Sequence, residues 1–183
     1  TERLIAIMSA VYGAITTQTE EGEMEWRIYD MCSYISRYET IVCSYVGSIK
    51  PQVCYLVFEV SSRERFETLQ KCFYHIQQHV PKDCVYVVIG TKLDLGHVDS
   101  KISKDAREWA CGIRAVYGEI SNKTQTNVHL LFPLTLRLLN LNLNASVSSL
   151  SNFKCTLILI GFFVRDLLFA DLFDSMQRDW IER

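Results

Sequence analysis

The stretch Val85-Tyr86-Val87-Val88-Ile89-Gly90-Thr91-Lys92-Leu93-Asp94 decides the fold of this chain. Its first six residues form an apolar run typical of a buried strand, and a polar loop from Thr91 to Asp94 follows directly. A second triplet, Ser121-Asn122-Lys123, begins 27 positions after Asp94 and ends another strand-like run beyond a helical segment. Loops at the carboxyl ends of adjacent parallel strands are where an open α/β sheet binds ligands. The two motifs therefore predict one binding site at the edge of a parallel sheet.

The composition is that of a globular protein. The chain has 183 residues, about one domain, and its 49% hydrophobic content is enough for a sizeable core. A formal net charge of −2 gives no basic surface for a phosphate backbone, which argues against nucleic acid as a partner. The seven cysteines show no CxxC spacing and lie mostly in apolar runs, which favours reduced thiols and a cytoplasmic location.

Strand-like and helical patterns alternate along the chain. Alternation on both sides of the polar turn Glu20-Glu21-Gly22 predicts a hairpin, and Ser61-Ser62-Arg63-Glu64 predicts a capped helix start. This order predicts a doubly wound, mostly parallel α/β sheet whose hairpin supplies one antiparallel edge strand. The expected elements are the hairpin over 14–19 and 24–29, a strand over 53–60, a helix from 61 that stops before Pro81, helices over 103–111 and 127–141, and a polar connector over 140–152.

Residues 153–173 are apolar enough to suggest a membrane span. The longest charge-free stretch, 155–164, is half of what a span needs, and Arg165 and Asp166 would lie in lipid. The continuous run Leu157-Ile158-Leu159-Ile160 instead predicts a buried parallel strand, with a turn beginning at Gly161. We therefore expect no transmembrane segment. Residues 176–183 carry no cysteine motif for prenylation, so we expect only indirect association with membranes.

Several motifs occur in an order that resembles a small GTPase of the Ras superfamily, closest to the Rab family in layout. The resemblance covers residues 24–135 and implies a P-loop GTPase fold, GTP or GDP with Mg²⁺ as ligands, and a role in vesicle trafficking and signal transduction through an effector or another GTPase-like domain. The matching stretches are EWRIYD (25–30), SRYETIVCSYVGS (36–48), YLVFEVSSRERFETL (55–69), VIGTKLDL (88–95), which is nearer to the Rho wording, and GEISNKTQTNVHLLF (118–132).

The same resemblance assigns a guanine-binding role to the two polar motifs. A carboxylate at Asp94 can accept from both the ring N–H and the exocyclic amine of guanine, a pattern that adenine lacks. The Lys92 stem would lie along the base and ribose, Lys123 would pack on the other face, and Ser121 would fix the loop. The backbone N–H near Asn122 would bond the guanine carbonyl. The predicted nucleotide-binding residues are Thr91, Lys92, Asp94, Ser121, Asn122 and Lys123.

The phosphate-binding motif of the family is altered. The pattern GxxxxGK[ST], whose backbone N–H groups, lysine and hydroxyl hold phosphate and Mg²⁺, occurs nowhere in these 183 residues. The nearest stretch is 161–168, which follows a strand-like run as a P-loop does. There Asp166 replaces the second glycine, Leu167 the lysine and Leu168 the hydroxyl residue, while Arg165 could compensate in part. We expect weak or absent binding of a triphosphate.

The switch motifs depart from the family in the same way. Asp30 stands where the family aspartate holds Mg²⁺ through water, but Ser33 and Tyr34 replace the γ-phosphate-sensing glycine and the water-orienting glutamine. The region aligned with the first switch, 7–10, offers Ser9 at best. We therefore assign no catalytic residue and expect impaired hydrolysis. The alternative is a genuine but weak guanine-nucleotide binder that uses the two polar motifs.

The order of segments suggests two domain arrangements. The P-loop-like strand and helix stand at 151–183, after a GTPase-like region over 1–150 that lacks its first strand and P-loop, whereas the family places them first. Either the chain is a circular permutant whose 151–183 segment completes the same sheet, or a second GTPase-like domain of a tandem protein starts there. Surface termini that lie close together make the first arrangement feasible.

Overall fold

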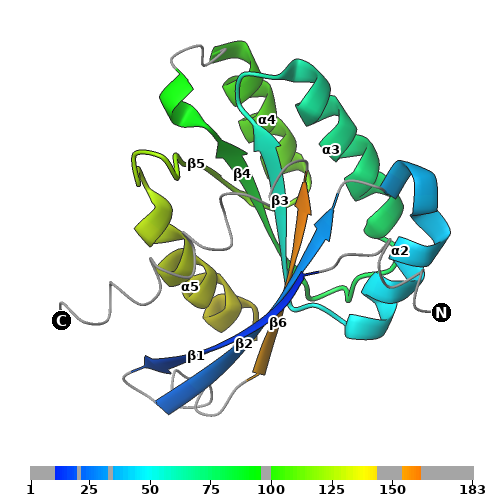
Figure 1. The fold of residues 1–183 in the computed structure, drawn as a ribbon, viewed down its shortest axis with the longest axis vertical. Helices are drawn as coiled ribbons and strands as arrows, with labels where there is room; N and C mark the ends of the chain where they lie inside the picture. The colour runs from blue at the N-terminus through cyan, green and yellow to red at the C-terminus, as the bar shows by residue number, and fades with distance from the viewer. Residues whose placement is uncertain (1–10, 20–21, 33–34, 96–99, 144–153, 162–183) are drawn as a thin grey trace.

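The computed structural model describes residues 11–19, 22–32, 35–95, 100–143 and 154–161. Figure 1 shows a twisted sheet with helices on both faces. The first strand pairs antiparallel with the second, and all other pairings are parallel, which confirms the predicted fold class. In spatial order the six strands are β1 (Val11–Thr19), β2 (Gly22–Cys32), β6 (Lys154–Gly161), β3 (Val53–Glu59), β4 (Val85–Thr91) and β5 (Val116–Glu119).

The strand β6 lies at the centre of the sheet although it comes last in the chain. Leu157 is paired with Ile28 of β2 on one side and with Val53 of β3 on the other. Its residues from Leu157 to Ile160 are at most 1% exposed. A strand that is covered on both faces must be apolar throughout, which explains the continuous run in the sequence.

Two groups of helices enclose the sheet (Figure 1). One face is covered by α2 (Ile35–Ile49), α3 (Arg63–Ile76) and α4 (Ser100–Gly112), whose apolar residues pack with alternate strand residues such as Leu56 and Phe58. The other face is covered by the 3₁₀ turn η2 (Val128–Leu130) and α5 (Leu131–Leu143), which pack with Tyr55 and Val57. Successive side chains of β3 therefore point alternately into the core on one face of the sheet and into the core on the other.

The capped helix start predicted at 61–64 is confirmed in α3. The Ser62 hydroxyl accepts a hydrogen bond from the backbone N–H of Arg65 at 3.3 Å, which satisfies one of the free N–H groups of the first turn. Phe66, Leu69, Phe73 and Ile76 are buried, as their helical spacing predicted.

Some predicted boundaries need correction. The polar connector expected over 140–152 is shorter, because α5 continues to Leu143. Leucines of α5, including Leu136 and Leu138, pack against the core on that face of the sheet. The helix expected from Ser103 begins earlier, at Ser100. Residues 144–153 and those after Gly161 lie outside the described part of the chain. None of the helices described is long and apolar enough to cross a membrane.

Candidate functional site

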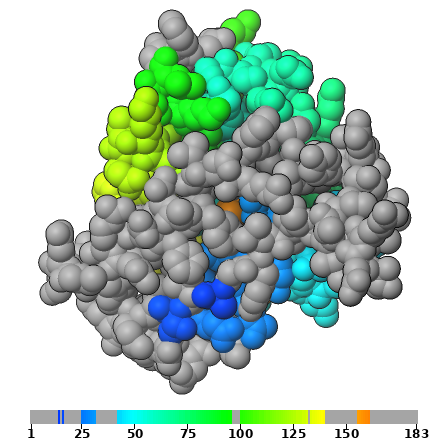
Figure 2. Space-filling view, viewed as in Figure 1, coloured from blue at the N-terminus to red at the C-terminus, as the bar shows by residue number. Residues whose placement is uncertain are grey.

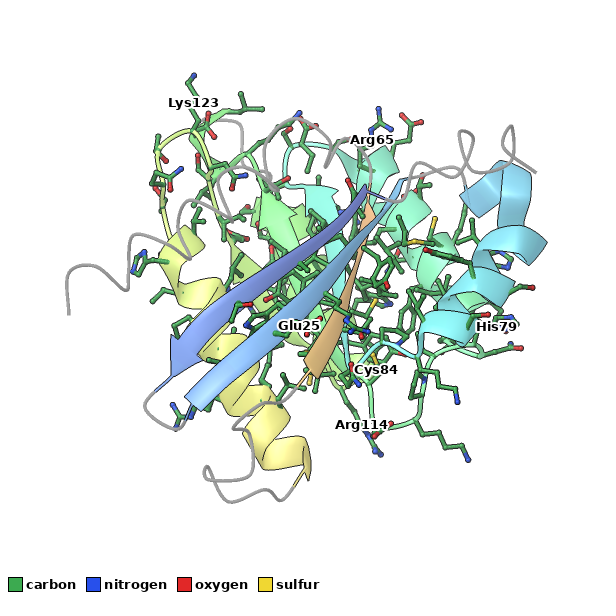
Figure 3. All side chains as sticks on the ribbon, turned by 60° about the horizontal axis from the view of Figure 1, so that its bottom comes forward. Glu25, Arg65, His79, Cys84, Arg114 and Lys123 are labelled. Carbon is green, nitrogen blue, oxygen red and sulfur yellow. The ribbon has the colours of Figure 1, made fainter. Side chains whose placement is uncertain are left out.

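The carboxyl ends of the parallel strands meet at one edge of the sheet, and both polar motifs follow strands that end there. β4 ends at Thr91, and β5 ends at Glu119, two residues before Ser121. Figure 3 shows Lys123 at this edge and Cys84 and Arg114, which precede β4 and β5, toward the opposite end of the molecule. The parallel topology thus places both motifs where α/β sheets bind ligands.

Backbone hydrogen bonds join the loops after β4 and β5. The N–H of Leu93 donates to the carbonyl of Ile120 at 3.3 Å, and the N–H of Ile120 donates to the carbonyl of Gly90 at 2.8 Å. In Figure 2 the green segment around the end of β4 lies beside the yellow-green segment that follows β5 on the surface. The two motifs form one structure, which we call the base corner: Thr91 to Asp94 and Ser121 to Lys123.

Asp94 and Ser121 are the closest side-chain pair in the base corner. The Ser121 hydroxyl donates to Asp94 Oδ1 at 2.6 Å, and Lys123 Nζ lies 3.9 Å from Asp94 Oδ2. The Ser121 hydrogen bond, helped by a backbone hydrogen bond and by the charges of Lys123 and Lys92, holds the pKa of Asp94 below its usual range although partial burial opposes this. Asp94 is therefore ionised at neutral pH and acts only as an acceptor.

Hydrogen bonds within the second motif fix its loop. The Thr124 N–H donates to Ser121 Oγ at 3.2 Å, and the Ser121 N–H donates to the carbonyl of Thr126 at 3.1 Å. The side chain of Gln125 donates to the carbonyl of Asn122 at 2.7 Å. Asn122 thus sits in a closed turn at the base corner, and Lys123, 77% exposed, extends from that turn toward solvent.

Thr91 and Lys92 connect the base corner to β3. The Thr91 hydroxyl donates to the carbonyl of Phe58 at 3.0 Å, and Lys92 Nζ lies 2.9 Å from Glu59 Oε2. The sequence analysis did not assign Glu59 to the site, and it named Ser61 only as part of a helix start. The sequence pattern that could have indicated Glu59 is a single carboxylate at the end of the apolar strand β3, which ends at the same edge of the sheet as β4 and β5.

Asp30 lies apart from the base corner. It is 3% exposed near the carboxyl end of β2, in register with Leu159 of β6, and β6 and β3 lie between β2 and β4. Gly161 ends β6 in register with Cys32. The structure thus brings the six predicted base-binding residues together but not Asp30, and the positions 7–10, 33–34 and 162–168 lie outside the described residues.

A mostly parallel sheet with helices on both faces and both polar motifs at its carboxyl edge has the architecture of the Ras-like GTPase fold. The model of the Ras family matches residues 9–140, and the chain belongs to this family. It is 32% identical over 77 residues to the Ras-related proteins Rab-22A and Rab-31 of Mus musculus, a match that covers 42% of this chain and 40% of each relative. It is 27% identical over 114 residues to RABA4b of Arabidopsis thaliana, which covers 62% of this chain and 49% of that protein. The chain thus matches less than half the length of these relatives, and the resemblance to a Rab-like small GTPase is confirmed.

Members of the Ras family bind GTP or GDP together with Mg²⁺. The donor and acceptor set of the base corner fits guanine, because an ionised Asp94 offers two acceptor oxygens to the two N–H groups that guanine presents side by side. Among the described residues, no group of three His, Cys, Asp or Glu side chains could hold a metal ion. Asp30 is the one metal-site residue predicted within them.

Proposed function

We propose that this chain is a Rab-like module that recognises the guanine base and holds the nucleotide phosphates weakly, and that it serves as a regulatory or binding module in vesicle trafficking. The observation that carries the proposal is the 2.6 Å hydrogen bond from Ser121 to Asp94, since it joins the two predicted halves of the base corner. Its protein partner would be an effector or a second GTPase-like domain that recognises whether nucleotide is bound.

The base corner selects guanine by its pattern of acceptors. Asp94 would accept from the ring N–H and the exocyclic amine, while adenine presents an unprotonated ring nitrogen at the corresponding place and would offer the carboxylate neither of these two donors. Lys92 and Lys123 would cover the two faces of the base, and the backbone near Asn122 would meet its carbonyl. An unpaired acceptor in a partly buried site costs more than a lost contact, so discrimination should be strong.

We propose weak phosphate binding from the sequence of residues 161–168. A carboxylate at Asp166 and the apolar Leu167 and Leu168 would face charged oxygens where the family has N–H groups, an ammonium and a hydroxyl. Replacing these charge-assisted contacts costs several kcal/mol of triphosphate affinity. Ser33 and Tyr34 stand where the family has its γ-phosphate-sensing glycine and its water-orienting glutamine, so hydrolysis by the family mechanism would lose its positioning group and be very slow or absent.

The central position of β6 supports a proposal about the domain arrangement. We infer that 154–161 takes the place of the first strand of the family sheet, so that 151–183 completes the sheet formed by 1–150. A circular permutation produces this order within one chain. In the tandem alternative, the same segment would begin a second GTPase-like domain and its place in this sheet would be taken by another strand.

A titration with fluorescent GDP and GTP, with and without Mg²⁺, tests the proposed function. We expect saturable binding that depends little on Mg²⁺ and that falls about 100-fold or more in Asp94→Ala, because two charge-assisted hydrogen bonds are lost. Glu108→Ala is the control, since Glu108 is an exposed residue of α4 that pairs with Lys104. Binding that survives Asp94→Ala would refute the assignment of the base corner.

The second candidate is a working GTPase with a weak but complete site. The base corner supports it equally, and the phosphate side distinguishes the two. Tight binding that requires Mg²⁺, together with release of phosphate from GTP, would favour this candidate over the first.

A further inference from the structure

A second ion pair adjoins the base corner on β3. Lys92 Nζ lies 2.9 Å from Glu59 Oε2, and the Ser61 hydroxyl donates to Glu59 Oε1 at 2.7 Å. The hydrogen bonds from Ser61 and Lys92 hold the pKa of Glu59 below its usual range, against the effect of partial burial. Both oxygens of this carboxylate thus have partners, so the anion is fixed in place at neutral pH.

The backbone around this ion pair holds the ends of β3 and β4 together. The Val60 N–H donates to the carbonyl of Thr91 at 3.1 Å, and the Thr91 hydroxyl donates to the carbonyl of Phe58 at 3.0 Å. Lys92 itself has a φ of 61°, in the left-handed region. Since residues on both sides of Glu59 bond to Thr91, the carboxylate keeps a fixed position relative to the lysine that it binds.

Four of the charges in this region form two separate pairs, and the charge of Arg65 also acts on Glu59. Lys92 and Asp94 are only two residues apart, and the charge of Lys92 contributes to the low pKa of Asp94. The ammonium of Lys92 nevertheless bonds Glu59, whereas Asp94 is bound by Ser121 and has Lys123 at 3.9 Å. Glu59 is therefore the anion that competes with Asp94 for Lys92.

We propose that Glu59 is a positioning residue of the base corner, which holds the Lys92 ammonium away from Asp94 and so keeps the Asp94 carboxylate available to the two N–H groups of guanine. The same contact extends the Lys92 stem across the edge of the sheet, where it can cover the base. This inference rests on the proposed function and adds to it a residue from a third strand.

A double-mutant cycle tests the proposal in the full chain, with GDP and ADP titrations as readouts. Glu59→Gln keeps the shape and removes the charge, and Lys92→Met keeps most of the stem and removes the ammonium. We expect Glu59→Gln to weaken GDP binding about fivefold to tenfold and to reduce the preference for GDP over ADP. In the Lys92→Met background the same substitution should have no effect, because no ammonium remains to be held.

Controls separate positioning from a structural role. Glu108→Gln, which removes a charge from the exposed pair with Lys104, should leave both affinities unchanged. If Glu59→Gln fails to fold, Ser61→Ala removes one of the two partners of the carboxylate and should give a smaller effect in the same direction, again only when Lys92 is present. Equal losses of GDP affinity with and without Lys92, or a preference for GDP that does not change, would overturn the proposal.

The failure of this inference differs from the failure of the proposed function. If Asp94→Ala lowers GDP affinity but the Glu59 and Lys92 substitutions act independently, only the role of Glu59 is refuted. If Asp94→Ala has no effect, or the unmodified chain binds no guanine nucleotide, the base corner is not a guanine site and both proposals fall.

Discussion

The base corner and the carboxyl end of β6, where the proposed phosphate-binding loop begins, lie at the same edge of one sheet but differ in how well they match the family. In the base corner, backbone bonds from Leu93 and Ile120 join the loops, and the Asp94 and Ser121 side chains bind each other. The proposed phosphate-binding loop, 161–168, has Asp166, Leu167 and Leu168 where the family has a glycine, a lysine and a hydroxyl residue.

Under the proposed function, the base-binding half of the site is kept because the sheet itself supports it. The base corner is part of how β3, β4 and β5 are joined, so many of its residues also stabilise the fold. The predictions below test the two halves, beginning with the largest expected effect.

The central strand β6 gives the largest expected change in stability. Leu157 is fully buried and paired on both sides, so Leu157→Ala should lower the free energy of unfolding by about 2–5 kcal/mol. Denaturant unfolding measures the loss. Leu130→Ala is the control, since Leu130 is 51% exposed and should change stability by about 0.5 kcal/mol or less. Equal, small effects of both substitutions would contradict the central position of β6.

The second prediction exchanges the base that the corner selects. Asp94→Asn replaces an acceptor by a donor, and xanthine has a carbonyl where guanine has its exocyclic amine. We expect GDP affinity to fall about 100-fold and affinity for xanthosine diphosphate to rise above that of the unmodified chain. Parallel titrations of both nucleotides measure this exchange. A variant that loses GDP without gaining the xanthine nucleotide would argue against direct contact between Asp94 and the base.

The third prediction concerns the close contact of β4 with the end of β3. A Cβ at Gly90 would lie 2.4 Å from Val60 Cγ1, and a β-branched valine has little rotamer freedom to move away. Gly90→Ala should therefore destabilise the fold by about 1–3 kcal/mol and weaken GDP binding by displacing Thr91.

Gly118→Ala is the matched control for that substitution. Gly118 is in register with Ile89 on the neighbouring strand, yet nothing lies within 4 Å of an added Cβ. We expect no loss of stability there. A similar loss at both glycines would show that the effect comes from backbone entropy and not from the contact with Val60.

The smallest predicted effect lies on the α5 face. The buried Tyr55 hydroxyl is hydrogen-bonded to the Thr135 hydroxyl. Thr135→Val should cost about 1–2 kcal/mol of stability because the phenol keeps only a long contact to a carbonyl of α5. GDP affinity should not change, and a loss of affinity would show that α5 is coupled to the base corner.

Much of the fold was predictable because each element carries its own pattern. The apolar runs of β3, β4 and β6 and the spacing of Phe66, Leu69 and Phe73 in α3 specify strand and helix locally. The helix ends were less certain, as the extension of α5 to Leu143 shows, because packing of its leucines on the sheet outweighs the polar asparagines near its end.

The base corner was predictable for a different reason. Asp94 and Ser121 follow neighbouring strands, so topology alone brings them together. The pairing of Lys92 with Glu59 was not predictable, since Asp94 is the nearer carboxylate in sequence and the choice between the two depends on how β3 and β4 align. Ion pairs between strands are decided by tertiary structure, unlike an i,i+4 pair within a helix such as Lys104 with Glu108.

The central claim is that the chain recognises the guanine base and holds the phosphates weakly. The dependence of affinity on the number of phosphates tests it most directly. Titration of the chain with guanosine, GMP, GDP and GTP, at fixed ionic strength with and without Mg²⁺, measures how much each phosphate adds. We predict that all four bind within about tenfold of one another, which corresponds to about 1.4 kcal/mol, and that adenosine binds far more weakly. GTP or GDP binding a thousandfold tighter than guanosine, only with Mg²⁺, would contradict the account, as would equal binding of guanosine and adenosine.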